Sequence, residues 1–174
     1  MIDAFVHADG FTHVLAFLVL LSRIGDVVST RLVTPTLRLE ANPIVRRLGW
    51  RFAASTLLVA AIPYVMLELG VVVLTTSLLV AGSNFSRGWL VHALGEAEYE
   101  DLLLRVASRG KRRVALGFIL AGAAHVAAAG VVLMWLSTPY QWGYYSGLGV
   151  LFYGLVVAIY GSLFVVRLFR RAGR

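Results

Sequence analysis

Four apolar stretches alternate with short polar segments along the chain. Their approximate limits are residues 11–33, 51–81, 114–136 and 144–166. An α-helix needs roughly 20 apolar residues to cross the hydrocarbon core of a bilayer, and each stretch reaches that length. The pattern therefore predicts an all-α integral membrane protein with a four-helix transmembrane bundle, in which residues 1–174 form a single membrane domain.

The second apolar stretch is longer than one perpendicular crossing and contains Pro63 and Glu68. We expect it to tilt, to kink at Pro63, or to fold into a hairpin near Glu68. Charge favours the hairpin, because five crossings would place all of the 16 Lys and Arg residues except Arg23 on one side. Length favours a single crossing, because residues 70–81 are too short to span alone. We predict four crossings with a cytoplasmic C-terminus, and the side of the N-terminus stays open.

Residues 95–109 form the clearest amphipathic segment. Acidic residues fill its first half and basic residues its second half, which suits the helix dipole. Its apolar positions recur every three or four residues, at Tyr99, Leu102, Leu103, Val106 and Ala107. The segment is predicted to be an interfacial helix between the second and third spans. It would lie on the membrane face or dock on another protein chain, and its acidic half favours the protein contact.

Composition supports the membrane class and narrows the chemistry. The chain is 59% hydrophobic and 14% charged, with a mean hydropathy of +0.81, which is too apolar for a soluble domain. Its net charge of +7 sits in basic clusters beside the apolar stretches, a pattern typical of topology signals and not of nucleic-acid binding. Cysteine is absent, which excludes disulfides, thiolate metal sites and thiol catalysis.

Polar residues interrupt the first apolar stretch at helical spacing. Arg23, Asp26 and Thr30 follow an i, i+3, i+7 pattern and therefore share one helix face. An ionised carboxylate inside hydrocarbon needs a partner, and Arg23 is the nearest. The group is predicted to be either a self-neutralising pair that fixes the helix in the bundle or part of a functional polar site.

Glu40 and Asn42 follow this stretch, after a turn at Pro35. If the chain folds back there, their oxygens return to the membrane face near Asp26 and could form a hard-cation site or a polar entrance. The alternative is local: Asn42 caps a helix that Pro43 opens, and Glu40 complements its positive end. No His joins the group, so we predict no transition-metal site.

The run D-V-V-S-T followed by L-E-A-N-P resembles the Asp-x3-Thr…Glu-x-Asn-Pro signature of a family of small multi-pass prokaryotic membrane proteins without an assigned activity. The resemblance covers about the first third of the chain and falls on Asp26, Thr30, Glu40, Asn42 and Pro43. It implies that these residues act as a set and that the protein resides in a prokaryotic inner membrane. It supplies no substrate.

Glu68 is a second carboxylate within apolar sequence, and no Lys or Arg lies within one turn of it. It is predicted to act as a proton carrier or to stay neutral and hydrogen-bond to another helix. Gly147, Gly154 and Gly161 recur every seven residues in the fourth span. This spacing predicts close packing against the third span or another protomer.

His125 lies near the middle of the third span, among small residues that leave a clearing around it. A His in such a clearing can ligate the central metal of a flat macrocycle. Ala-x3-His with Trp135 ten residues further on resembles the pigment-binding helix of bacterial light-harvesting polypeptides, which implies a haem or chlorophyll-type cofactor at His125. The alternative is helix packing, in which the imidazole bonds to a neighbour such as Glu68 and a small-residue stripe makes the contact: Gly117, Ala121 and Ala129.

Known catalytic motifs do not mark this sequence. It lacks His-Glu-x2-His, Gly-x-Ser-x-Gly and Walker patterns. We therefore predict a non-enzymatic accessory or assembly subunit of a membrane complex or homo-oligomer, with lipid and other membrane chains as partners. A transporter or channel that uses the intramembrane carboxylates is the first alternative, and cofactor binding through His125 is the second.

Overall fold

The computed structural model describes residues 9–139 and 141–173, and the regular secondary structure in these ranges is helical. Three long helices are α2 (Gly10–Val33), α4 (Leu67–Leu94) and α6 (Arg112–Leu136). A fourth continuous rod joins α7 (Trp142–Val156) to α8 (Ser162–Arg171) through a short π-helical segment, η2 (Val157–Gly161). All four are long and apolar enough to cross a membrane. The predicted all-α fold with four membrane-length helices is therefore confirmed.

The limits of the second span are a correction. The run of residues 51–81 is broken at Val65 and Met66, and the second long helix is α4. Ahead of the break lie α3 (Pro43–Ser55) and a 3-10 helix, η1 (Thr56–Tyr64). Pro63 lies within η1, where a missing N–H and a bulky ring prevent an α-helical ladder from continuing. The backbone amides of Val65 and Met66 both bond to the Ile62 carbonyl, which closes the turn.

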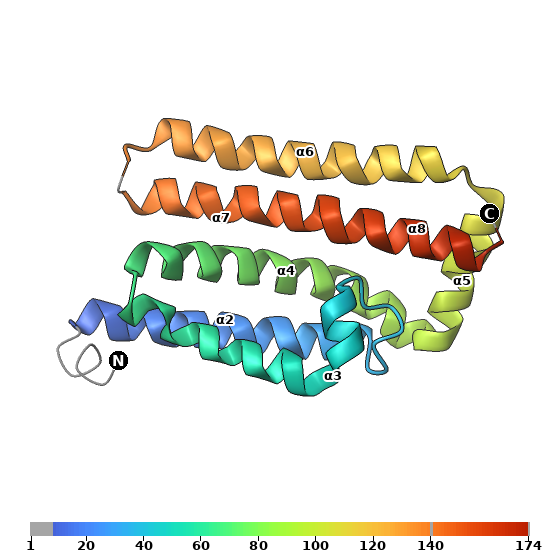
Figure 1. Ribbon diagram of the computed structural model, residues 1–174, viewed down its shortest axis with the longest axis horizontal. Helices are drawn as coiled ribbons and strands as arrows, with labels where there is room; N and C mark the ends of the chain where they lie inside the picture. Colours follow the sequence, from blue (N-terminus) through green and yellow to red (C-terminus); the bar gives the residue numbers. More distant parts are fainter. Residues whose placement is uncertain (1–8, 140, 174) are drawn as a thin grey trace.

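The chain therefore passes along the long axis of the molecule five times, as α2, α3–η1, α4, α6 and α7–α8 (Figure 1). The α3–η1 pass is interrupted at Gly49, whose φ of 75° is a conformation that favours glycine. Beyond that kink, residues 50–64 are on the order of 27 Å long, because a 3-10 turn rises more per residue than an α turn. That length approaches the hydrocarbon thickness of about 30 Å.

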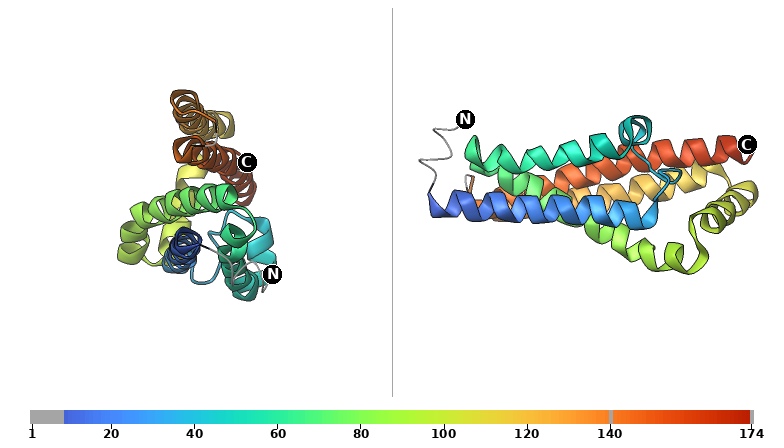
Figure 2. Two further views of the ribbon diagram at one scale, coloured as in Figure 1. Left: turned by 90° about the vertical axis from the view of Figure 1, so that its left-hand side faces the viewer. Right: turned by 90° about the horizontal axis from the view of Figure 1, so that it is seen from below.

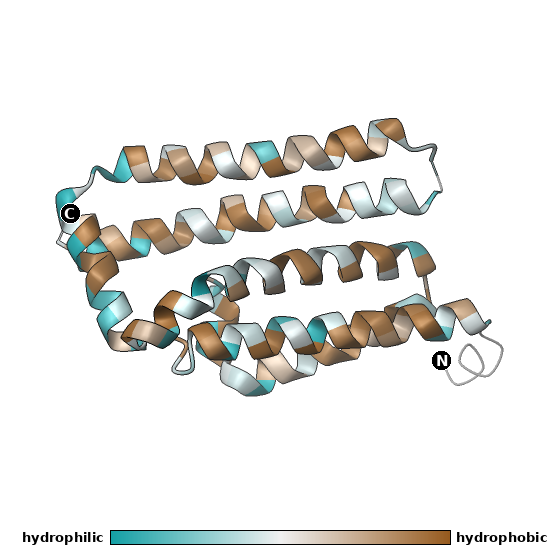
Figure 3. Cartoon of the chain, turned by 180° about the vertical axis from the view of Figure 1, so that it is seen from behind, coloured by the Kyte–Doolittle hydropathy of each residue, from teal (hydrophilic) through white to brown (hydrophobic). Residues whose placement is uncertain are grey.

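Three layers of helix follow one another across the bundle, and two further segments, α2 and α3–η1, lie together beyond the third. The end-on view places α6 at one edge, followed by α7–α8 and α4, with α2 and α3–η1 beyond (Figure 2). Apolar residues dominate the long rods, whereas hydrophilic residues gather at the end where α5 (Glu96–Arg109) crosses (Figure 3). A small apolar core of Leu15, Val19 and Val71 joins α2 to α4. Each interior helix thus packs on both sides, while α6 packs mainly on the C-terminal rod.

Glycines bring α6 and the C-terminal rod into close contact. A Cβ added at Gly130 would lie 2.6 Å from the Gly147 carbonyl oxygen, and one added at Gly154 would lie 2.9 Å from the Ala127 amide nitrogen. Gly161 meets the Ile119 side chain in the same way. The predicted packing role of the seven-residue glycine repeat is confirmed, because only hydrogen fits between backbones this close.

The small-residue stripe predicted on α6 makes no helix contact within the described chain. Gly117 and Gly122 have open space where a Cβ would be, and Ala121 and Ala129 are exposed. The helix rotates so that Ala123 and Gly130 are buried instead. The stripe therefore faces away from the rest of the chain.

The amphipathic helix α5 matches its predicted limits but packs within its own chain. Ala107 is buried against Val165 and Phe169 of α8. The buried Glu100 forms an ion pair with Arg171, also of α8. Part of its apolar face thus packs on the C-terminal rod, and the contact with another protein stays a prediction.

Candidate intramembrane polar site

Arg23 and Asp26 form an ion pair inside the first long helix. The Arg23 Nη1 lies 2.5 Å from the Asp26 Oδ2, and the two side chains are 18% and 14% exposed. Arg23 is about 15 Å along α2 from its Val33 end, a depth at which neither charge reaches bulk water easily. The helical i, i+3 spacing brings the two groups together, and this confirms the pairing predicted from sequence.

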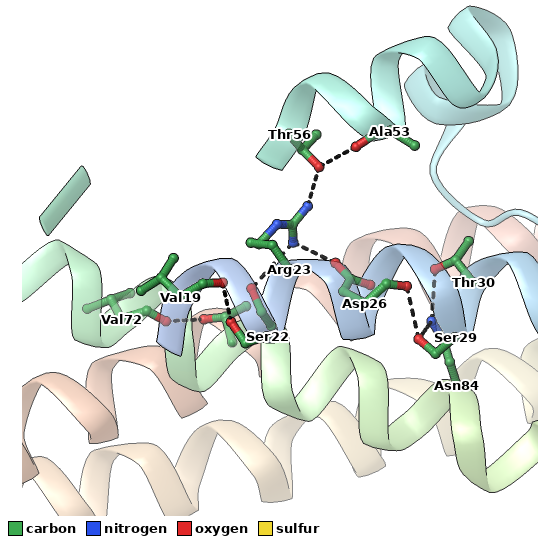
Figure 4. Close-up of polar contacts among 12 residues, drawn as sticks. Val19, Ser22, Arg23, Asp26, Ser29, Thr30, Ala53, Thr56, Val72 and Asn84 are labelled. Carbon is green, nitrogen blue, oxygen red and sulfur yellow. Dashed lines mark hydrogen bonds and ion pairs between the residues drawn. The ribbon is translucent and has the colours of Figure 1, made fainter. Parts of the chain in front are cut away.

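The guanidinium also joins α2 to two other elements (Figure 4). Its Nη2 donates to the Thr56 hydroxyl at 2.6 Å, at the start of η1, and its Nη1 lies 3.4 Å from the Ser77 hydroxyl of α4. The Thr56 hydroxyl in turn donates to the Ala53 carbonyl. Because arginine carries five N–H donors in a planar fork, one side chain can bond to three elements at once.

A second branch of the network begins at Asn84 of α4. Its amide nitrogen donates to the Thr30 hydroxyl at 3.0 Å and approaches the Ser29 hydroxyl at 3.3 Å. Ser29 donates to the backbone carbonyl of Asp26, so this branch reaches the residue that pairs with Arg23. The helix α4 continues to Leu94, and Asn84 turns inward toward α2.

The predicted capping role of Asn42 is confirmed. The Asn42 side chain accepts a bond from the Ile44 amide at the start of α3, and a Glu40 carboxylate oxygen accepts one from the Asn42 amide. Arg167 of α8 donates to the Glu40 carbonyl and holds this loop against the C-terminal rod. The two halves of the Asp-x3-Thr…Glu-x-Asn-Pro motif thus have different roles: Asp26 and Thr30 join helices, whereas Glu40 and Asn42 shape a turn.

The charge of Asp26 nevertheless affects the pKa of Glu40. Burial raises the pKa of Glu40; the Asn42 hydrogen bond opposes this rise, and the negative charge of Asp26 adds to it. The joint site of Glu40 and Asp26 that the sequence suggested stays a prediction. No hydrogen bond between the two carboxyl groups occurs in the described part of the chain.

Glu68 lies apart from this network. It belongs to the first turn of α4, at the end of the bundle opposite to α5. There it lines a cavity of about 350 Å³ together with Thr12, Tyr64 and the turn that joins η1 to α4. The network thus combines Arg23, Asp26 and Thr30 but not Glu68.

His125 lies on the exposed face of α6. Its Nδ1 is 2.8 Å from the Ala121 carbonyl oxygen in the preceding turn. The suggested bond to Glu68 is wrong, because α6 packs on α7, η2 and α8 and not on α4. A carbonyl can only accept, so Nδ1 carries the proton and Nε2 keeps its lone pair.

Glu96 organises a third polar group, outside the membrane-length helices. Its carboxylate accepts bonds from the Thr34 and Thr36 hydroxyls at 2.7 and 2.8 Å and from the Thr36 amide at 3.0 Å. Burial alone would raise the pKa of Glu96, but these bonds outweigh it and hold the pKa below its ordinary range. Glu96 thereby ties the start of α5 to the turn that follows α2.

Sequence reasoning missed Thr56, Ser77 and Asn84. Each lies in an apolar run, and a polar residue in such a run is a signal in itself. The direction in which it points depends on helix rotation, which the sequence pattern left open. Within residues 9–139 and 141–173, no three His, Cys, Asp or Glu side chains gather as a metal site would require. The arrangement suits internal neutralisation of charge.

Comparison with known proteins gave no match to any family model, curated protein or solved structure.

We predict that Arg23→Met or Asp26→Asn destabilises the protein by about 3–5 kcal/mol, because each leaves one buried charge or its hydrogen-bond partners unpaired. The double variant should lose less than the sum of the two. Thermal unfolding in a mild detergent, followed by circular dichroism, measures all three. Arg87→Met is the control, because Arg87 is exposed and contacts only Ser83 of its own helix. An Asp26→Asn protein of native stability that has lost flux in a reconstituted transport assay would contradict the structural role and favour transport.

We also predict opposite pH effects at Glu96 and Glu40. Glu96 has a lowered pKa when folded, so its carboxylate stabilises the fold at neutral pH and that contribution disappears as the pH falls through the lowered pKa. Glu96→Gln should therefore cost about 1–2 kcal/mol near neutral pH. Glu40 has a raised pKa when folded, so its charge destabilises the fold at neutral pH and Glu40→Gln should stabilise it.

Unfolding midpoints measured from about pH 7 to about pH 3 follow both variants against the wild type, and the two differences should shrink toward acid pH as the carboxyl groups protonate. Glu98→Gln serves as the control, since Glu98 is exposed on the same helix as Glu96. Differences of the same sign at Glu40 and Glu96 would refute the proposed environments.

Proposed function

We propose that this protein is a non-catalytic subunit of a helical assembly in the membrane and that α6 supplies the contact. The observation that supports this role is the outer face of α6, which packs on nothing else in the described chain. The face exposes the imidazole of His125 at mid-span and small residues on either side of it: Gly117, Ala121, Gly122, Ala128 and Ala129.

A lipid-facing imidazole is costly, because hydrocarbon offers no partner to its lone pair. A neighbouring helix removes this cost if it brings a donor to Nε2. Small residues around His125 let another backbone approach closely, which is how helices associate in a bilayer without a hydrophobic driving force. The intramembrane pair supports the same role, because Arg23 and Asp26 neutralise each other and serve the interior of the subunit.

We further propose that the basic end of the bundle faces the cytoplasm in a prokaryotic inner membrane. With five passes, the Arg-rich segments in the first part of α3, around α5 and at the end of α8 all lie at this end. The positive-inside rule then places the C-terminus inside and the start of α2 outside. The resemblance to small prokaryotic membrane proteins is the basis for the compartment.

A second candidate function is macrocycle binding at His125, because the imidazole already has the geometry of a ligand. Its Nδ1–H donates to the Ala121 carbonyl, and histidines that bind metals commonly use a carbonyl in this way to fix the ring. The free Nε2 faces outward among small side chains that would admit a flat ring. A haem or chlorophyll-type group would be the ligand.

Cysteine cross-linking tests the assembly, and the natural chain contains no cysteine to interfere. Ala129→Cys, one turn from His125, should form an oxidative cross-link in native membranes, because the assembled helices approach closely at that face. Leu58→Cys is the control, since Leu58 is 79% exposed on η1, away from α6. Adding His125→Leu to Ala129→Cys should weaken the cross-link.

Mass spectrometry of the cross-linked product identifies it as a second copy or a foreign chain. Equal cross-linking at positions 129 and 58 would refute the α6 contact. A visible absorption band that His125→Leu removes would instead favour the macrocycle.

Labelling with a membrane-impermeant maleimide tests the orientation. Val65→Cys, in the exposed turn between η1 and α4, should be labelled on intact cells, because five passes place this turn outside. Ser108→Cys, exposed on α5, should be labelled only after permeabilisation. The reverse result would invert the orientation, and protection of position 65 under both conditions would contradict the fifth pass.

A further inference from the structure

A groove lies between the last turns of α2 and the C-terminal part of α4. It encloses a cavity of about 300 Å³, and eight residues line it: Ser29, Leu32, Val33, Asn84, Phe85, Gly88, Trp89 and His92. The groove forms where α4 leaves α2 and continues toward α5 (Figure 2). Gly88 contributes to the opening, because a Cβ added there would come no closer than 3.9 Å to its nearest neighbour, a Val33 methyl carbon.

The walls of the groove are apolar and face the bilayer. Leu32, Phe85 and Trp89 are 59%, 52% and 70% exposed, so lipid contacts them directly. The floor is different, because Ser29 is fully buried there and bonds to Asn84 of the polar network. An occupant must therefore be apolar on its outer side and tolerate polar atoms on its inner side.

The rim supplies the hydrogen-bond donors. Trp89 and His92 follow one another at one-turn spacing near the end of α4, and neither bonds to another residue within the described ranges. An indole N–H can only donate, and a neutral imidazole carries one N–H. Asn84 cannot add a donor, because its amide already bonds to Thr30 and Ser29. The free donors call for acceptor atoms on the ligand.

Depth and charge narrow the ligand further. The groove lies within the last turns of α2, where Trp is typical of the boundary between hydrocarbon and headgroups. Glycerol ester groups of phospholipids occupy that boundary, and their carbonyl oxygens accept but do not donate. No Lys, Arg, Asp or Glu lines the groove, so the headgroup charge is not what its walls recognise.

We propose that this groove is a phospholipid site, in which Trp89 and His92 donate to the glycerol ester carbonyls and the first part of an acyl chain lies along Leu32 and Phe85. The small volume holds the ester region and the adjoining methylenes, while the headgroup and the rest of the chains stay in the bilayer. The site fixes one lipid where α2 and α4 separate, on the side of the groove that no protein element covers.

Native mass spectrometry of delipidated, full-length protein with added palmitoyl-oleoyl phosphatidylglycerol tests the site. The wild type should retain one lipid per chain under conditions that strip surrounding lipid. Gly88→Leu, which fills the groove, should lower that occupancy about tenfold, equivalent to the loss of a well-formed contact. Gly82→Leu is the matched control, because Gly82 lies on the same helix with open space around it, and it should bind as the wild type does.

Two further measurements keep the test independent of the fold of Gly88→Leu. Trp89→Phe retains the ring but removes the N–H, and it should lower occupancy about threefold to tenfold. An ether-linked lipid with the same headgroup and chains lacks the ester carbonyls and should bind more weakly to the wild type. Equal occupancy of the ester and ether lipids, or equal occupancy in the wild type and both groove variants, would overturn the proposal.

Discussion

The rest of the bundle depends on the bonds of a single guanidinium in a medium of low dielectric constant. Arg23 is paired with Asp26 on its own helix and with hydroxyls on η1 and α4. Transfer of either charge to hydrocarbon alone would be prohibitive, so the charges are stable only when their partners are in place. The network therefore favours one arrangement of three elements, and close glycine contacts then attach the C-terminal rod and α6.

The irregular second pass, α3–η1, has a local cause. Pro63 has no backbone N–H to donate and its ring clashes with the preceding turn, so the segment that contains it does not continue as a simple α-helix. It becomes a 3-10 helix, which is longer for the same number of residues, and the hydroxyl of Thr56 at its start accepts a hydrogen bond from Arg23. A feature that looks like a defect in the helix thus serves the polar network at its centre.

Polar groups on the outer faces of the bundle differ from those in its interior in the partners they have. Within the network, the Arg23 Nη atoms and the Asn84 amide meet acceptors, while the buried Arg23 Nε has no hydrogen-bond partner among the described residues. Glu96 and Glu100 tie α5 to neighbouring segments. On the outer faces, the side chains of His125, Trp89 and His92 are exposed, and their polar ring atoms can bond to a partner in the bilayer. We therefore propose a protein contact at His125, which lies at mid-span, and a lipid at Trp89 and His92, which lie near the boundary between hydrocarbon and headgroups.

The sequence by itself determined the membrane class, three of the four long apolar helices and the limits of α5, and it offered the Asn42 cap and the pairing of Arg23 with Asp26, each beside an alternative. These features depend on local spacing or on hydrophobic length, which a sequence states directly. Tertiary structure decided which residues complete the site, because Thr56, Ser77 and Asn84 become partners only through the rotation and contact of separate helices. It also decided the five-pass path and the outward face of α6, since local apolarity is the same whether a segment packs on protein or on lipid.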